Sequence, residues 1–397
     1  MKALSQRALR WLWRAAFLSI LFPLCYFVFS RKPVRACKAV FVSYRGDESP
    51  SSFERIQKGL EKRGFFCSVR LLRRNTVSRA RHAALCIGML RDIADARFVF
   101  VSSGSNTLSR VKLRPQTEMV QLWHACGAFK RFGYSSADRI FGGDEKELGR
   151  YPNYRNDDFA FVSSPEVVWA YNEAFGVGRT SHAKVLPLGV SRTDIFFEKG
   201  AKEKAMEWML ELAPEARGKK IALYAPTYRG RAGSPAAPGA LDAALLERRL
   251  GREWFLAVKQ HPLVKKRPGI YGSSESFAKD ISGKIPMEEA LLCADCLITD
   301  YSSAVFEYSL LSRPMVFFAF DKEAYLDWRG FYYPFEEFAP GEIAASSAEL
   351  ADAVARADRF DKGRIDAFRE KFMSSCDGFS TERIVAFLTG ERGGKEG

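Results

Sequence analysis

The chain has 397 residues, which exceeds one ordinary hydrophobic core and suits two domains of about 150–200 residues each. Hydrophobic residues make up 47% and charged residues 27% of the chain, a globular composition that excludes wholesale disorder. The net charge of +14 is concentrated in the N-terminal fifth of the sequence. A nucleic-acid enzyme spreads positive charge along its groove, so this distribution favours an anionic membrane surface, and not nucleic acid, as a partner.

Residues 15–30 are uncharged and mostly apolar, and basic residues flank them on both sides. The segment is shorter than the ~20 residues that a membrane-spanning helix needs. Three alternatives stay open: a secretory signal, a true span, and an interfacial anchor with Trp11 and Trp13 at the headgroup level. We expect residues 1–36 to attach the chain to the cytoplasmic face of the cell membrane.

Short apolar segments alternate with helical ones through the first half of the body. The predicted strands are residues 38–44, 65–72, 97–103, 120–123, 159–163 and 184–188. The predicted helices are residues 51–63, 82–94 and 164–175. This alternation is typical of a parallel, doubly wound sheet with helices on both faces.

The same pattern restarts after a boundary near residues 195–215. The predicted elements are strands at 220–225, 254–259, 296–299 and 314–320, helices at 287–292 and 302–311, a loop at 230–238 and a helical tail from about residue 347. The sequence therefore predicts an α/β protein with two Rossmann-like domains that face a cleft. We assign residues 37–200 to the first domain, 215–385 to the second, and 386–397 to a flexible tail.

Common signatures of other enzyme classes are missing from the sequence. It has no P-loop, no Gly-x-Gly-x-x-Gly and no His-Glu-x-x-His, which disfavours ATPases, dehydrogenases and zinc hydrolases. The eight cysteines are scattered, and Cys293 and Cys296 have no second pair, so we expect them at apolar core positions and not at a zinc or redox site. We expect no bound metal and no cofactor.

Two of the four histidines stand directly after predicted strands, one in each half of the chain. His124 follows the strand at 120–123, and His261 follows the strand at 254–259. A neutral imidazole is the natural general base near pH 7. A lone histidine at a strand end usually has a structural role. Two histidines in corresponding places leave a structural and a catalytic role equally open.

Two further strand ends carry groups suited to phosphate. Ser302 and Ser303 open a predicted helix, where a serine hydroxyl can act as an ordinary N-cap or, with the helix N–H groups, bind an anion such as a diphosphate. Thr227 and Arg229 stand just past the strand at 220–225. The arginine fork suits phosphate, although an arginine in a surface turn is the alternative.

Taken together and in this order, the motifs resemble the CDP-glycerol glycerophosphotransferases of wall teichoic acid synthesis. The resemblance spans about residues 38–385 and is carried by Gln121-Leu-Trp-His124 with Lys130, Tyr224-Ala-Pro-Thr-Tyr-Arg229, Gln260-His-Pro262, Leu297-Ile-Thr-Asp-Tyr-Ser-Ser303 with Phe306-Glu307, Pro314-Met-Val-Phe-Phe, and Arg329-Gly-Phe-Tyr-Tyr-Pro-Phe-Glu336 with Ala339-Pro-Gly341. It implies a GT-B fold, a CDP-alcohol donor, a lipid-linked glycan or polyol-phosphate acceptor, and release of CMP.

The resemblance also implies residue roles. The catalytic residues would be His124, as the general base, and His261, with Lys130 on the acceptor side. The positions implied at the donor are Thr227, Arg229, Asp300, Ser302, Ser303, Glu307 and Arg329. Glu307 would hold a ribose or glycerol hydroxyl, and the two serines would hold the diphosphate.

One position departs from the family pattern, and several alternatives stay open. Ala125 stands where the family usually has glycine after the first histidine, and alanine tolerates a positive φ poorly. The alternatives are a CDP-ribitol donor, a GT-B transferase that uses a nucleotide sugar, and a membrane-docked protein with a degraded site. The chain length resembles the compact members that add a first glycerol phosphate to a lipid-linked disaccharide. The sequence leaves the oligomeric state open.

Overall fold

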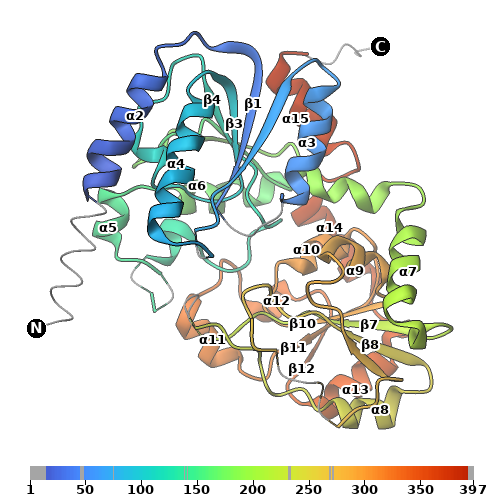
Figure 1. The fold of residues 1–397 in the computed structure, drawn as a ribbon. Coiled ribbons are helices and arrows are strands. Elements are labelled where there is room, and N and C mark those ends of the chain that lie inside the picture. Colours follow the sequence, from blue (N-terminus) through green and yellow to red (C-terminus); the bar gives the residue numbers. More distant parts are fainter. Residues whose placement is uncertain are drawn as a thin grey trace, which may run out of the picture.

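The structure of the chain, a computed structural model, describes residues 15–44, 49–74, 76–137, 139–140, 142–230, 234–267, 270 and 272–391. Within these ranges the chain forms two parallel sheets of six strands each, one in each half (Figure 1). This confirms the predicted α/β class with two parallel-sheet domains.

The first sheet has the strand order β2-β1-β3-β4-β5-β6. Its strands are β1 (Arg35–Ser43), β2 (Phe66–Leu71), β3 (Ala96–Val101), β4 (Glu118–Gln121), β5 (Phe159–Phe161) and β6 (Lys184–Leu186). The central strands are apolar on both faces because helices cover both. Val40 and Val99 point to the face that α2 (Phe22–Phe29) and α4 (Arg79–Ile93) cover, whereas Phe41 and Phe100 point to α3 (Ser51–Glu61).

The second sheet has the strand order β12-β11-β10-β7-β8-β9. Its strands are β7 (Lys220–Tyr224), β8 (Trp254–Val258), β9 (Ala278–Asp280), β10 (Cys296–Thr299), β11 (Met315–Phe318) and β12 (Glu342–Ala344). Leu223 and Phe255 face the side of α9 (Met287–Cys293) and α14 (Lys362–Met373), and Leu256 faces α8 (Ala243–Leu250) and α13 (Ser347–Ala355). Cys293 and Cys296 are buried and free, as the apolar interpretation predicts.

The remaining helices connect and cover these two layers. They are α5 (Glu145–Arg150), α6 (Val168–Phe175), α7 (Ala201–Leu212), α10 (Ala304–Ser309), α11 (Lys322–Arg329), α12 (Phe335–Phe338) and α15 (Ser380–Thr389). Single turns of 3-10 helix include Pro165–Val167, which opens α6, and a longer 3-10 segment spans Ser191–Phe197 after β6.

The last helix differs from the sequence-based assignment. We assign residues up to 385 to the second half, but α15 packs beside α3 on the first sheet, as Figure 1 shows in red and blue. Ile384 and Val385 of α15 share one core with Phe53 of α3, because the apolar face of α3 would otherwise be exposed. The predicted flexible tail begins inside this helix, and residues 392–397 lie outside the described part of the chain.

The apolar N-terminal segment is packed on the first domain. Its residues 17–29 are helical and contact α4, with Leu18, Phe22 and Tyr26 buried in the core. Within the described residues, no helix is both long and apolar enough to cross a membrane. Trp11 and Trp13, the expected headgroup anchors, lie outside the described residues.

Candidate active site

Three candidate residues lie at one edge of the second sheet. Asp300 directly follows β10, Thr227 is three residues past β7, and His261 is three residues past β8. These strands are adjacent in the order β10-β7-β8 and all run parallel. Their carboxyl ends therefore meet at one edge, which is where open α/β sheets bind their ligands.

Thr227 and Asp300 are joined directly. The Thr227 backbone N–H donates to Asp300 Oδ1 at 2.8 Å, and its hydroxyl donates to Oδ2 at 3.0 Å. The Tyr301 backbone N–H donates to the same Oδ1 at 2.6 Å. Asp300 is buried, and these bonds satisfy its carboxylate. Asp300 thus fixes the two strand-end loops to each other.

Arg229 lies in the same network and binds two carboxylates. Its Nη1 lies 2.9 Å from Asp300 Oδ2, and its Nε and Nη2 donate to Asp321 at 2.5 and 2.9 Å. Tyr301 also donates its hydroxyl to Asp321. The resemblance implies that Arg229 contacts a donor phosphate, but here aspartates bind both edges of its guanidinium group. Its contact with a donor phosphate stays a prediction, and its observed role is to hold the loop.

His261 accepts a hydrogen bond at Nδ1. The Leu263 backbone N–H donates to this atom at 3.1 Å. An accepting Nδ1 carries no proton, so in the neutral ring the proton is on Nε2. The Tyr228 ring packs edge-on against the imidazole, with 4.8 Å between ring centroids. His261 is therefore oriented as a hydrogen-bond donor through Nε2.

Ser302 and Ser303 open α10 as predicted. The Ser302 hydroxyl accepts the Ala304 backbone N–H at 3.2 Å, which is the ordinary cap interpretation of this serine. Ser303 is the N-cap residue, but its side chain makes no cap bond. Both side chains are half-buried. A diphosphate contact at these hydroxyls stays a prediction.

His124 stands three residues past β4 in the first sheet, with its side chain exposed. Its Nδ1 lies 3.0 Å from the Ser102 carbonyl oxygen. A carbonyl only accepts, so the proton sits on Nδ1 and the lone pair on Nε2. This is the form that a general base requires.

A strained residue precedes His124. Trp123 has a φ of 53°, an unusual conformation for a bulky residue. The Gln121 side-chain oxygen accepts the Trp123 backbone N–H at 3.1 Å, and the Gln121 amide donates to the buried Asp157 at 3.2 Å. Backbone strain of this kind concentrates at functional sites, where the surrounding structure holds it.

Ala125 does not have a positive φ, the conformation that alanine tolerates poorly. Among the described residues, the non-glycine positions with positive φ are Arg73, Trp123 and Ser312. The glycine that needs such freedom is Gly127, with a φ of 58°. A Cβ there would lie 2.2 Å from the Phe306 ring of α10. The departure at Ala125 therefore leaves the backbone at His124 intact.

Lys130, which the resemblance assigns to the acceptor side, lies where the two halves of the chain meet. It pairs with Phe331 in an isolated antiparallel bridge, and the Arg131 backbone N–H donates to the Gly330 carbonyl at 3.1 Å. Burial lowers the pKa of the Lys130 ammonium, as does the charge of Arg329, while Asp300 opposes this. The lysine therefore faces donor-half residues as well.

Glu307 has an unexpected partner. It is buried in α10, and its carboxylate forms an ion pair with Arg192 of the first half. Burial raises the pKa of Glu307, and Arg192 opposes that rise. The predicted contact of Glu307 with a ribose or glycerol hydroxyl stays a prediction.

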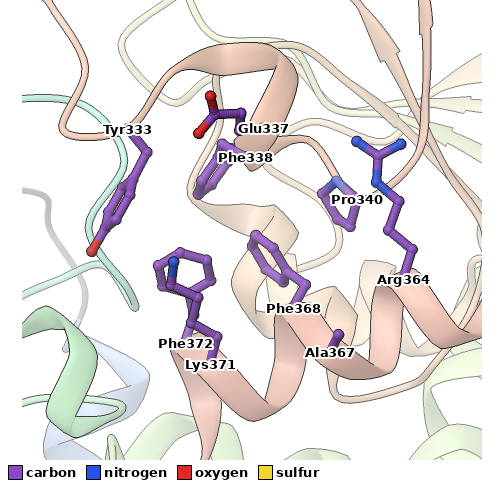
Figure 2. A pocket seen from close by; sticks show the side chains of 9 residues that line it. All are labelled: Tyr333, Glu337, Phe338, Pro340, Arg364, Ala367, Phe368, Lys371 and Phe372. Atoms are coloured by element: carbon purple, nitrogen blue, oxygen red, sulfur yellow. The ribbon is translucent and has the colours of Figure 1, made fainter.

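A separate hollow of about 240 Å³ lies elsewhere in the second half. Figure 2 shows it between α12 and α14, lined by aromatic rings with Arg364 and Lys371 at its edge. None of the predicted site residues lines it. Among the described residues, no group of three or more His, Cys, Asp or Glu side chains is placed to hold a metal ion.

Some of the predicted site residues therefore contact one another directly, and others are connected through a third residue. Thr227, Arg229 and Asp300 touch one another, and His124 is linked to Glu307 through Arg192. Sequence reasoning missed Asp321 and Arg192. Arg192 had a signal, since it follows a predicted strand in the manner of the other site residues. Asp321 had the same signal, since it directly follows the predicted strand at 314–320, but only the fold shows that it binds Arg229.

Comparison with known proteins shows which family the chain belongs to. The sequence profile of CDP-Glycerol:Poly(glycerophosphate) glycerophosphotransferases matches residues 24–390. A teichoic acid ribitol-phosphate primase of Bacillus spizizenii is 34% identical over 364 residues, which cover 90% of this chain and 92% of the relative. A teichoic acid glycerol-phosphate primase of Bacillus subtilis is 29% identical and covers 69% of this chain and 68% of the relative.

The fold is also that of a solved structure. The wall teichoic acid polymerase TagF, in its H444N variant, superposes with a TM-score of 0.77 at 21% identity and covers 98% of both chains. The similarity supports the GT-B-like architecture of two parallel-sheet domains. Since the profile match covers nearly the whole chain, this protein belongs to the CDP-glycerol:poly(glycerophosphate) glycerophosphotransferase family.

Proposed function

We propose that this enzyme transfers glycerol phosphate from CDP-glycerol to a hydroxyl of a lipid-linked acceptor in the synthesis of a teichoic-acid-like cell-surface polymer. The observation that carries the proposal is that the two strand-end histidines make opposite contacts at Nδ1: that of His124 lies beside a carbonyl oxygen, and that of His261 accepts a backbone N–H. One presents a lone pair at Nε2 and the other presents a proton at Nε2. A transfer reaction that needs one base and one donor uses this arrangement directly.

The reaction consists of one displacement at phosphorus. The acceptor hydroxyl attacks the glycerol-side phosphorus while Nε2 of His124 takes its proton. The bond from this phosphorus to the bridging oxygen breaks, and CMP leaves with the electron pair. Nε2–H of His261 donates to the diphosphate oxygens as charge develops, and the hydroxyls at the start of α10 hold the diphosphate. Such transfers depend chiefly on positioning and charge stabilisation.

The membrane surface is the second part of the proposal. The outward face of the helical segment 17–29 exposes Ile20, Leu24 and Phe27 by more than half. Arg31 and Lys32 follow this segment directly, and residues 15–44 contain no acidic side chain. An apolar ridge next to cations suits the interface of an anionic bilayer. We propose that this ridge holds the enzyme at the cytoplasmic face of the membrane, where lipid-linked acceptors lie.

CDP-ribitol is a second candidate donor, and one observation favours it. The ribitol-phosphate relatives are 33–35% identical to this chain, whereas the glycerol-phosphate relatives are 28–30% identical. The mechanism above is unchanged by the longer polyol, since the same phosphorus reacts.

The test is release of nucleotide from a donor panel in the presence of detergent-solubilised lipid acceptors. CMP from CDP-glycerol supports the proposal, and CMP mainly from CDP-ribitol changes the substrate but keeps the mechanism. UDP release from UDP-sugars, with no CMP from either alcohol, would replace the proposal with a sugar transferase. If no nucleotide is released, calorimetry with CDP-glycerol separates a missing acceptor from a site that no longer binds.

A further inference from the structure

One guanidinium in the structure touches both the loop of His124 and the helix of the donor site. Arg192 lies in the 3-10 segment Ser191–Phe197 of the first half, and its side chain is 16% exposed. Its Nη1 donates to the His124 carbonyl oxygen at 3.0 Å, and its Nη2 forms an ion pair with Glu307 of α10. Its Nε lies 4.0 Å from Glu288 Oε1 at the start of α9.

We propose that Arg192 is a positioning residue of the transfer reaction, which holds the base His124 of the first half in register with the donor-binding helix α10 of the second. This rests on the proposed function, in which His124 and the start of α10 act on the same phosphorus. Arg192 touches neither substrate nor reacting atom in this account, and it acts through the backbone of His124 and the carboxylate of Glu307.

The contacts around the His124 loop support this role. On the first-half side, the Tyr171 hydroxyl donates to the carbonyl oxygens of Ala125 and Gly127 at 3.1 and 3.0 Å. On the second-half side, Gly127 sits so close to Phe306 that a Cβ would overlap the ring. The segment from His124 to Gly127 therefore packs on α10, and Arg192 ties the His124 backbone to Glu307 of that helix.

The chemistry of arginine suits this bridge. A planar fork can donate to a carbonyl and pair with a carboxylate at once, whereas lysine offers a single point charge. A buried ion pair adds little net stability compared with apolar packing, because desolvation offsets its attraction. The main effect of the Arg192–Glu307 pair is therefore to fix the His124 segment of the first half against α10 of the second. Glu288 is itself tied to the first half, since the Ser51 hydroxyl donates to its Oε1 at 2.8 Å.

The first test measures the NMR signals of the His124 ring and needs no catalytic turnover. The chain has four histidines, so ring-labelled histidine gives few NMR signals, and His124→Ala identifies the one of interest. In Arg192→Ala, we expect the His124 ring signals to shift, while those of His82 and His182 stay in place. Unchanged His124 signals would overturn the proposal, whatever the enzyme's substrate proves to be.

The second test separates positioning from binding. We expect Arg192→Ala to lower kcat by about 10²-fold, the cost of a misplacement of about 1 Å, with less than a threefold change in the CDP-glycerol Kd measured by calorimetry. Arg192→Lys should lower kcat almost as far, and it serves in both tests if the alanine variant does not fold. A shift of the His124 signals with unchanged kcat would also overturn the proposal.

The control is Arg55→Ala. Arg55 pairs with Glu198, which directly follows the same 3-10 segment, but this pair lies at the surface of the first half. We expect wild-type kcat and wild-type His124 signals in this variant. If Arg55→Ala disturbs His124 as strongly as Arg192→Ala does, the effect of Arg192 is general destabilisation of the segment, and the positioning role is wrong. If the wild-type enzyme releases no CMP, the proposed function fails, while the NMR comparison still decides whether Arg192 positions His124.

Discussion

His124 and His261 carry their ring protons on opposite nitrogens. The Ser102 carbonyl holds the proton of His124 on Nδ1, and the Leu263 backbone N–H donates to Nδ1 of His261. Each tautomer follows from a backbone contact, and the two contacts lie in different halves of the molecule. His124 can therefore accept a proton at Nε2 and His261 can donate one, which leads to the first prediction.

Replacement of His261 should depend on whether the new side chain can donate. We expect His261→Ala to lower CMP release by about 10²–10³-fold, the usual cost of removing one donor to a developing charge. His261→Gln keeps an amide donor and should retain more activity. Steady-state CMP release measures both variants, and equal activity of the glutamine and alanine variants would contradict a donor role for His261.

Substitutions at Gly127 and Ala125 test which of these two positions next to His124 requires glycine. Gly127→Ala places a Cβ 2.2 Å from the Phe306 ring at a φ of 58°, so we expect a loss of about 2–4 kcal/mol in unfolding free energy. Ala125→Gly removes only a methyl group at an ordinary φ and should change stability by less than about 1 kcal/mol. Urea denaturation measures both, and the reverse order of effects would contradict the loop geometry.

The buried Asp157 carboxyl should make stability depend on pH. Burial raises its pKa to about 7 from an ordinary 3.8, and the Gln121 hydrogen bond opposes part of this rise. The unfolded chain releases this proton near pH 4 and the folded chain near pH 7, so the wild-type protein loses up to about 4 kcal/mol across this interval as pH rises.

Asp157→Asn removes that titration. Its unfolding free energy should therefore fall less than that of the wild type between about pH 5 and pH 8, as denaturation curves at both pH values will show. Parallel pH profiles of the two proteins would mean that Asp157 is already ionised in the folded state.

The exposed ridge of the N-terminal helix should control membrane binding. We expect Leu24→Asn with Phe27→Asn to reduce cosedimentation with vesicles of phosphatidylglycerol and phosphatidylcholine by at least about tenfold. Phe379→Asn is the matched control, since Phe379 is equally exposed but lies at the start of α15. Equal loss in the control, or none in the double variant, would place the lipid contact elsewhere. Deletion of 1–36 is less informative, because it also removes the core residues Leu18, Phe22 and Tyr26.

Much of the fold could be predicted because its strands are short, apolar and buried on both faces. Segments such as 97–103 and 254–259 have that pattern, and the structure places β3 and β8 there. The edge strands β9 and β12 were not predicted, because their sequences Ala-Lys-Asp and Glu-Ile-Ala lack the apolar run that marks the equally short β5 and β6. The return of α15 to the first sheet was missed for another reason: its apolar face fits either half, and only the uncovered surface of α3 decides.

The candidate site, like the fold, could be predicted only in part. Residues directly after strands could be placed from sequence, because parallel strands bring their carboxyl ends to one edge. The contacts that these side chains make with one another could not be predicted. The phosphate contact of Arg229 stays a prediction, and the sequence did not show that Asp321, ninety-two residues away, binds its guanidinium group. The hydroxyl contact of Glu307 likewise stays a prediction, and the sequence did not show its ion pair with Arg192 of the other half.

The most direct test of the central claim is CMP release from CDP-glycerol and CDP-ribitol by the wild type and by His124→Ala, with donor binding measured in parallel. We predict that the wild type releases CMP and that His124→Ala releases it about 10²–10⁴-fold more slowly with the donor Kd unchanged, because only the general base is lost. Near-normal turnover in His124→Ala with intact donor binding would contradict this mechanism.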